Sequence, residues 1–362
     1  MLPSGLPICS VRSHSLYPDP MNAFLELPEV RRRAAFLQVN EQMGLQEVSV
    51  EKDFWVCWTL RELFAMPSIG EHLTFKGGTS LSKAWKLIHR FSEDIDLVVD
   101  KELLGFGGDA APDQAPSKKQ SKVRLEKLAE ACKGWVQEKL LKELDQQIRS
   151  LLGDKGWYLE VDPDMPDGQC LLFHYPSVFS KEAAGYVRPV VKIELGARSD
   201  DWPAERREIQ PYVTELFPQL DADTICSVKV LAAGRTFWEK ACLLHEETFR
   251  PKEKRRKIRM ARHYYDLWCL LQAGVGDRAL ADRDLFARVA SHREIFFSYS
   301  WVDYSTHKPG SFRLMPPEEH LADWRFDYQE MLGPMFFGET PTFEELMTSA
   351  RNFEERFNAS AK

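Results

Sequence analysis

Several familiar sequence patterns are missing from this chain, and each absence excludes a class of protein. The 362 residues hold seven cysteines, scattered without a Cys-x-x-Cys pair, which argues against a zinc module and for reduced thiols in the cytoplasm. No run approaches 18 uninterrupted apolar residues, so a membrane span is not expected. The N-terminus has no basic segment followed by an apolar core and lacks the pattern of a secretory signal. We therefore expect a cytoplasmic protein with no membrane partner.

Patterns of covalent catalysis are missing as well. There is no Gly-x-Ser-x-Gly elbow, no cysteine stands out as the partner of a histidine, and His245 and His263 form no pair with metal-ligand spacing. The sequence thus gives no support for a hydrolase that works through a covalent nucleophile.

The composition favours a large globular chain of mixed class. Hydrophobic residues make up 44% of the sequence, enough to bury a substantial core in one large domain or two. Helical and strand patterns both occur, which predicts a mixed α/β or α+β class. We expect irregular chain over residues 1–20. The other predicted elements are helices over residues 27–44, 50–66 and 119–152, the last broken near Gly134, strands over residues 156–161, 170–175 and 187–195, and mainly helical chain over residues 232–273.

The most informative stretch is residues 75–100, FKGGTSLSKAWKLIHRFSEDIDLVVD. Residues 73–76 form a short apolar and β-branched run, which predicts a strand that ends at a Gly-Gly turn. Thr79 or Ser80 can cap the helical pattern that follows. A glycine turn at a helix start exposes free backbone N–H groups where the helix dipole is positive. The sequence therefore predicts a place for a triphosphate.

Two carboxylates follow within the same stretch. Residues 94–99, DIDLVV, predict a strand. Because side chains two apart share a face, Asp94 and Asp96 are expected to point together while Ile95 and Leu97 pack inward. Adjacent carboxylates repel and raise one another's pKa unless a cation neutralises them. Mg²⁺ is the usual partner where phosphates bind, so we expect Mg²⁺ or Mn²⁺ here.

A basic run interrupts an otherwise acidic chain. The formal charge is −7, yet residues 252–262, KEKRRKIRMAR, carry seven basic side chains and one acid. A basic stripe on an acidic body can track a phosphate backbone. The candidates for RNA binding are Lys254, Arg255, Arg256 and Lys257. A solvated surface segment is the alternative.

These motifs resemble those of a known family. Residues 76–83, KGGTSLSK, followed by residues 90–97, RFSEDIDL, resemble the nucleotidyltransferase AbiEii/AbiGii toxin family, which belongs to the DNA polymerase beta-like nucleotidyltransferase superfamily. Residues 236–245, TFWEKACLLH, resemble the lysine-bearing helix of that family, and residues 262–267, RHYYDL, resemble its final aspartate motif. The resemblance spans roughly residues 50–275.

The resemblance implies a fold and a division of the chain. The expected fold is mixed α/β (α+β), with a polymerase beta-like nucleotidyltransferase core on a mixed sheet and a mainly helical C-terminal region. We expect the core over residues 21–230, with a helical insertion near residues 119–152, and a C-terminal domain over residues 231–362 that carries the later motifs.

The resemblance also implies roles for single residues. It places a third acid on a strand beside the Asp-x-Asp strand, and Glu194 is the candidate; a surface pair with Lys192 is the alternative. Lys240 and Asp266 are expected to act together on the nucleotide. In the structural alternative, Lys240 extends to solvent and Asp266 pairs with Arg262 one helical turn earlier.

Together these inferences predict a metal-dependent nucleotidyltransferase that moves a nucleoside monophosphate from an NTP to an acceptor and releases pyrophosphate. The predicted catalytic residues are Asp94, Asp96, Lys240 and Asp266, the predicted metal ligands are Asp94, Asp96 and Glu194, and the predicted nucleotide-binding residues are Lys76, Gly77, Gly78, Thr79, Ser80 and Lys83.

The biological role comes from the resemblance alone. It implies the toxin of a bacterial type IV-like toxin–antitoxin or phage-defence pair, with RNA, in particular tRNA, or a protein as the acceptor and a cognate antitoxin protein as a partner. Two alternatives remain open: a non-catalytic nucleotide- or RNA-binding regulator, and a two-metal phosphodiesterase or nuclease.

Overall fold

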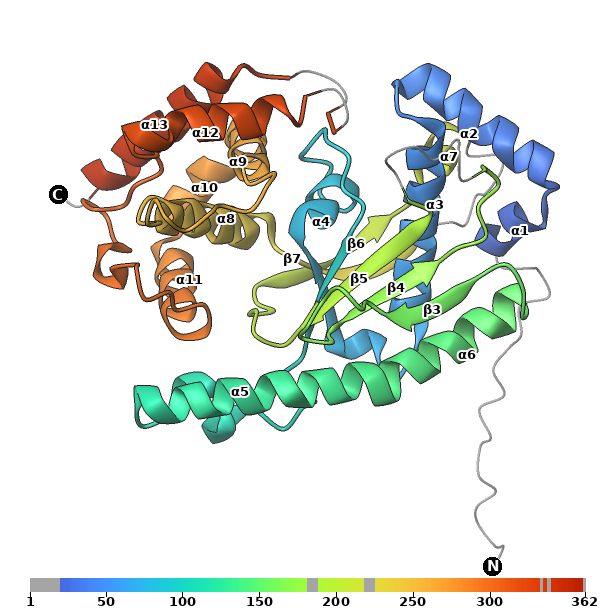
Figure 1. The fold of residues 1–362 in the computed structure, drawn as a ribbon, viewed down its shortest axis with the longest axis horizontal. Coiled ribbons are helices and arrows are strands. Elements are labelled where there is room, and N and C mark those ends of the chain that lie inside the picture. The colour runs from blue at the N-terminus through green and yellow to red at the C-terminus, as the bar shows by residue number, and fades with distance from the viewer. Residues whose placement is uncertain (1–19, 181–187, 218–224, 333–334, 337–339, 361–362) are drawn as a thin grey trace, which may run out of the picture.

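A computed structural model describes residues 20–180, 188–217, 225–332, 335–336 and 340–360 of the protein. Over these residues, seven strands form one mixed sheet in the order β3-β4-β5-β2-β1-β7-β6 (Figure 1). The strands are β1 (Leu73–Lys76), β2 (Ile95–Val99), β3 (Tyr158–Val161), β4 (Cys170–His174), β5 (Val190–Gly196), β6 (Ala204–Ile209) and β7 (Cys226–Leu231). The predicted mixed α/β class is confirmed. The segment predicted to be irregular lies outside the described residues, except for Pro20.

The centre of the sheet brings the predicted motifs side by side. β2 lies between β1 and β5, antiparallel to the first and parallel to the second. In this register Lys76 stands opposite Asp96, and Asp96 stands beside Glu194. Because side chains alternate along a strand, residues in register project from the same face. Strand pairing therefore gathers these three side chains on one face of the sheet.

The opposite face of the sheet is covered by helix α3 (Glu47–Ala65). Ile95 and Leu97 belong to the same hydrophobic cluster as Trp55 and Trp58 of that helix. The predicted inward packing of Ile95 and Leu97 is confirmed, and each such burial stabilises the fold by about 1.5–3 kcal/mol. Lys76, Asp96 and Glu194 therefore lie on the face of the sheet that α3 does not cover.

The N-terminal half contains further helices. They are α1 (Pro20–Glu26), α2 (Glu29–Met43), α4 (Gly77–Lys83), α5 (Lys118–Trp135), α6 (Leu141–Leu152) and α7 (Tyr212–Leu216). The long helix predicted over residues 119–152 runs along the sheet in Figure 1. The break predicted near Gly134 is wrong. Instead, a π-helical turn over Val136–Leu140 joins α5 to α6 without interrupting the helix.

The strand pair β6 and β7 was not among the predicted elements. Residues 205–208 of β6 are all exposed charged side chains, so the strand has no apolar alternation by which a sequence pattern could detect it. Charged side chains on an edge strand hinder pairing with another chain. The strand predicted over residues 187–195 is β5, and Val187 lies outside the described residues.

The C-terminal part is mainly helical, as predicted. Its helices are α8 (Ala233–Glu247), α9 (Arg262–Gln272), α10 (Val275–Ala281), α11 (Arg283–Phe296), α12 (Glu318–Gln329) and α13 (Phe343–Ala359). They share a second hydrophobic cluster, which also contains Leu81 of α4 and Ile88. The domain boundary near residue 230 stays a prediction. Among the described helices, none combines the length and the apolar character that crossing a membrane requires.

Candidate functional site

The Gly-Gly turn predicted from the sequence is the first turn of α4, directly after β1, and the side chains around it shape it. Gly77 has φ +79°, in the left-handed region, and a Cβ there would collide with the carboxylate of Asp96. A Cβ on Gly78 would lie 2.5 Å from Nη2 of Arg90 and 2.9 Å from Oγ of Ser92. Gly77 needs glycine for its backbone conformation and its close approach to Asp96, and a larger residue at Gly78 would displace Arg90 or Ser92. The turn is therefore packed directly against Asp96 and Arg90.

Two hydroxyls fix the turn in place. The Thr79 hydroxyl donates to the carbonyl oxygen of Asp94 at 2.6 Å and lies 2.8 Å from the Ser92 hydroxyl. The Ser80 hydroxyl donates to the carbonyl oxygen of Gly77 at 2.9 Å. Both side chains are buried. These bonds connect the turn to the start of β2 and so hold it beside the first aspartate.

Three acids lie close together on the polar face of the sheet. Burial raises the pKa of Asp96 to about 6, and Glu194 and Asp94 add to the rise, while Lys76 and Arg262 oppose it. Burial also raises the pKa of Asp94, with further contributions from Glu93 and Glu194. Neighbouring acids with raised pKa values fit a divalent cation, because a cation would relieve their repulsion.

The side chains of these acids are not arranged as a finished ligand set. Among the described residues, no group of three or more acids, histidines or cysteines converges on one point. Glu194 forms an ion pair with Lys192 at 2.8 Å, which was the alternative considered from the sequence. The predicted alternation of β5 is confirmed, with Val191, Ile193 and Leu195 buried on the other face. The three acids therefore fit a cation by charge, and a change of rotamer would be needed to bring their oxygens together.

The two lysines that flank the turn have different surroundings. Lys76 projects onto the polar face, where its amine donates to the Ser199 hydroxyl at 2.8 Å and lies 3.7 Å from a carboxylate oxygen of Glu239 on α8. Lys83 is buried in an ion pair with Asp53, 2.8 Å away. Its amine also lies 3.5 Å from the centroid of the Tyr212 ring. The structure thus brings Lys76 to the acids and ties Lys83 to the helical layer on α3.

Asp266 lies in a buried cluster of three charges. Arg90 binds its carboxylate with two nitrogens at 2.6 and 2.8 Å, and the Lys240 amine lies 2.7 Å from one of its oxygens. The side chains of Arg90, Lys240 and Asp266 are at most 8% exposed. Although burial alone would raise the pKa of Asp266, the charges of Arg90 and Lys240 hold it well below its usual range. Burial lowers the pKa of Lys240, against the opposing charge of Asp266.

This cluster shows which partners Asp266 has, and its action on the nucleotide stays a prediction. The pairing with Lys240 is present, whereas the partner expected in the structural alternative, Arg262, is replaced by Arg90 from 176 residues earlier. Sequence reasoning missed Arg90, although it opens the RFSEDIDL motif. No spacing rule predicts a contact over that separation, because the fold alone brings the loop before β2 against α9.

The basic run is divided between surface and interior. Lys254, Arg255 and Lys257 are exposed, and the Lys254 amine lies 4.0 Å from the centroid of the Trp301 ring. Arg256 is different, because it lies 3.3 Å from a carboxylate oxygen of Glu247 and 4.1 Å above the Trp324 ring. The exposed cations remain candidates for RNA binding, while Arg256 stabilises the helical region.

Comparison with known proteins assigns the class. The sequence matches the family described as nucleotidyl transferase AbiEii toxin, Type IV TA system, over residues 58–355. The chain therefore belongs to the AbiEii nucleotidyltransferase toxin family and is a nucleotidyltransferase. No relative of curated function matches the sequence.

Two solved structures match this chain at low sequence identity. MenT4, a nucleotidyltransferase toxin from Mycobacterium tuberculosis, is 15% identical, with 89% of this chain and 88% of that chain covered and a TM-score of 0.46. JHP933 from Helicobacter pylori is also 15% identical, with 88% and 96% covered and a TM-score of 0.39. At these values, the class rests on the family match and not on either structure.

Proposed function

We propose that this chain is a metal-dependent enzyme that transfers a nucleoside monophosphate from an NTP to an acceptor. The observation that carries the proposal is the register of the central sheet, which places Lys76, Asp96 and Glu194 side by side. The Gly-Gly turn abuts Asp96 in the same place. A glycine turn at a helix start next to clustered acids suits metal-assisted phosphoryl-group chemistry.

Asp94, Asp96 and Glu194 would hold the divalent metal. When bound, Mg²⁺ or Mn²⁺ would neutralise the triphosphate and favour ionisation of the acceptor hydroxyl. The fit rests on the register that places Asp96 beside Glu194, and on the burial and mutual repulsion that raise the pKa values of Asp94 and Asp96. Glu194 would exchange Lys192 for the metal.

The phosphates would lie along the turn of Gly77, Gly78, Thr79 and Ser80, held by backbone N–H groups. Lys76 already projects onto this face and would leave Glu239 for a phosphate oxygen, since its 3.7 Å contact with that carboxylate is long. Lys240 would supply a second positive charge, with Asp266 holding it in position. We assign Lys83 to structural support, because Asp53 already neutralises it.

The acceptor in this proposal is RNA, tRNA in particular, with a protein acceptor as the competing reading. Family membership supports a toxin role with a cognate antitoxin. We also propose a cytoplasmic location, supported by six buried cysteines of the described residues that form no disulfide: Cys57, Cys132, Cys170, Cys226, Cys242 and Cys269.

The deciding experiment incubates the pure protein with each α-labelled NTP, Mg²⁺ and total cellular RNA. Label transferred to RNA together with released pyrophosphate supports the proposal. Label on a protein band points to a protein acceptor. Shortened RNA without label would support the nuclease alternative, and NTP binding without either product would support a non-catalytic regulator.

The exposed part of the basic run provides a prediction about the acceptor. Reversing Lys254, Arg255 and Lys257 to Glu is expected to raise the Michaelis constant for RNA by about 10-fold or more, because each lost phosphate contact lowers both the affinity and its salt dependence. NTP binding should be unchanged. The measurement is RNA affinity across a salt series.

The control is a triple reversal of the same charge at Lys142, Lys155 and Lys308, which are exposed elsewhere on the chain. Arg256 is left intact, because its substitution would break the ion pair with Glu247 and could change protein stability as well as RNA binding. If the two triple variants have equal RNA affinities and equal salt dependences of RNA binding, residues 252–262 are a solvated surface segment and not an RNA-binding site.

A further inference from the structure

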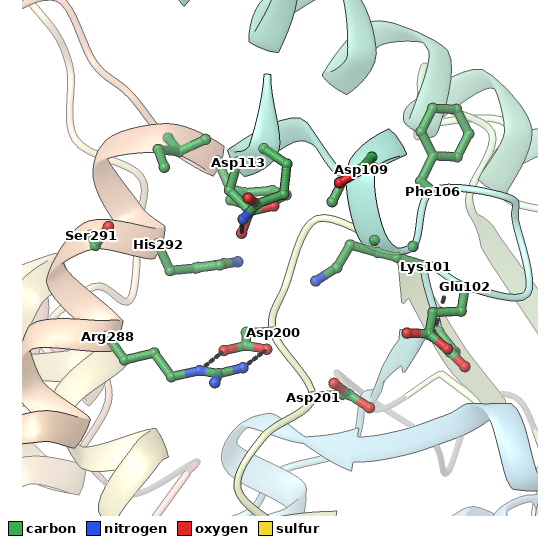
Figure 2. Close-up of a pocket in the computed structure, with 17 residues that line it drawn as sticks. Lys101, Glu102, Phe106, Asp109, Asp113, Asp200, Asp201, Arg288, Ser291 and His292 are labelled. Carbon is green, nitrogen blue, oxygen red and sulfur yellow. Dashed lines mark hydrogen bonds and ion pairs between the residues drawn. The ribbon is translucent and has the colours of Figure 1, made fainter. Parts of the chain in front are cut away.

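A pocket of about 560 Å³ lies past the ends of β2 and β5 (Figure 2). Its walls are α11, the segment of residues 100–114 that follows β2, and the Asp200-Asp201 segment that follows β5. This volume lies within the range of small-molecule sites, which is about 300–1,000 Å³. None of the functional residues considered so far lines it.

Two nitrogens project into this pocket without a matching partner. Nε2 of His292 is buried and has no hydrogen-bond partner in the described part of the chain. The Lys101 amine has no carboxylate within ion-pair distance there, and the contact recorded for it is with the Phe296 ring, 5.2 Å from the centroid. Figure 2 shows both side chains pointing toward one another across the pocket. A buried polar atom without a partner costs free energy, which a ligand atom would recover.

The protonation of His292 suits a neutral, polar ligand. Burial lowers the pKa of His292 to about 3, and the charge of Arg235 adds to the effect. The imidazole is therefore uncharged at neutral pH, with one nitrogen able to accept and the other to donate. A nucleobase or ribose presents groups of both kinds.

The pocket also offers flat apolar surfaces. The His292 ring stacks on Phe296, with centroids 4.3 Å apart and planes 13° apart. Figure 2 places Phe106 on the opposite side. Stacking on such rings binds bases with little regard to their identity.

Six acids line the pocket, and two of them, Asp200 and Asp201, are already neutralised. Arg288 binds the two oxygens of Asp200 at 2.7 and 3.0 Å, and Arg235 binds it at 2.8 Å. Lys229 lies 3.0 Å from Asp201. Asp200 and Asp201 are thus held in closed ion pairs. Lys101, on the wall of the same pocket, supplies a positive charge that can meet a ligand oxygen.

A chain of contacts joins this pocket to the polar face of the sheet, which carries Lys76, Asp96 and Glu194. Lys76 donates to Ser199, which directly precedes Asp200. Glu239 lies between Lys76 and Arg235, 3.7 and 3.2 Å from them, and Arg235 in turn binds Asp200. The strands that carry Asp96 and Glu194 both run into the walls of the pocket. These contacts connect the pocket to Lys76, which stands in register with Asp96.

We propose that this pocket binds the base and sugar of a nucleotide, with their polar atoms held by Lys101 and Nε2 of His292 and the base packed against the ring of Phe106. The proposal rests on the proposed function, because it names a substrate part for the same site. Two nucleotides have this chemistry: the incoming NTP and the terminal nucleotide of an RNA acceptor.

The test compares Lys101→Met and His292→Phe with the wild type and with Lys155→Met, an exposed lysine changed in the same way. The phenylalanine keeps a ring on Phe296 and removes Nε2. The probes are the four NTPs and four nucleoside monophosphates in calorimetric titrations without RNA, followed by steady-state transfer to total cellular RNA. Melting temperatures are measured for every variant.

The two sources give different results. If the NTP occupies the pocket, the dissociation constant for NTP rises by about 10-fold in both pocket variants without RNA, the cost of one lost hydrogen bond to a buried group. If the acceptor occupies it, NTP binding is unchanged and the Michaelis constant for RNA rises by a similar factor.

Folded pocket variants that stay within twofold of the wild type in both measurements would overturn the proposal. If one variant fails to fold, the other decides. Equilibrium binding can be measured without turnover, so the two proposals can fail separately. If the wild type binds nucleotide through Lys101 and His292 but transfers none, the proposed function is contradicted and the proposed pocket is supported.

Discussion

Asp96→Asn is expected to lower the rate of nucleotide transfer by at least about 100-fold while leaving the chain folded. Asp96 stands in register with both Lys76 and Glu194, so in the proposed function its carboxylate would hold the metal between the turn and the third acid. The amide keeps the shape of the side chain and removes the charge. Steady-state transfer at saturating Mg²⁺ is the measurement.

The stability of this variant should move in the opposite direction. The raised pKa of Asp96 means that folding disfavours its ionised form, so removing the charge should leave the free energy of unfolding unchanged or raise it by roughly 1 kcal/mol. Asp154→Asn, an exposed aspartate, is the control. Transfer by Asp96→Asn at a rate close to that of the control would exclude the metal assignment.

Asp266→Ala is expected to lower the free energy of unfolding by about 3–5 kcal/mol, because it leaves two buried cations without their counter-charge. The side chain of Asp266 is fully buried, and both Arg90 and Lys240 form ion pairs with it. Urea unfolding monitored by fluorescence gives the value. Arg262→Ala should cost less than about 0.5 kcal/mol, since Arg90 holds the position that helical spacing assigned to Arg262.

Lys240→Met separates support from catalysis. Arg90 keeps both bonds to Asp266 in this variant, and burial already disfavours the charged form of Lys240. The free energy of unfolding should therefore change by less than about 1 kcal/mol, while transfer should fall by about 100-fold or more. A destabilisation as large as that of Asp266→Ala, or transfer at the wild-type rate, would show that Lys240 is a structural residue only.

The same cluster gives a pH dependence. The folded-state pKa of Asp266 is depressed, so its contribution to stability is fully present above its unfolded value of about 4 and is lost as the pH falls through the acid range. Wild type should therefore lose stability on acidification more steeply than Asp266→Asn does. Parallel curves between pH 5 and 2 would contradict the ion-pair account.

How much of the site could be predicted from sequence depends on the range of each interaction. The strand of residues 73–76 and the alternation around Asp96 and Glu194 are local patterns with a period of two, and they were found. Two features escaped. β6 carries charged side chains in place of an alternating pattern, and Arg90 meets Asp266 across 176 residues.

The sequence alone determined the chemical groups: a glycine turn, an Asp-x-Asp strand, a family and hence a reaction class. These depend on neighbours in the chain, where backbone geometry fixes which side chains share a face. The tertiary structure decided which groups meet. It turned Lys83 toward Asp53, gave Asp266 the partner Arg90, and formed the pocket of Lys101 and His292 from segments almost 200 residues apart. The physical reason is that burying two hydrophobic clusters sets the relative positions of distant segments, and a charge buried in that process must pair with whatever side chain packing brings to it.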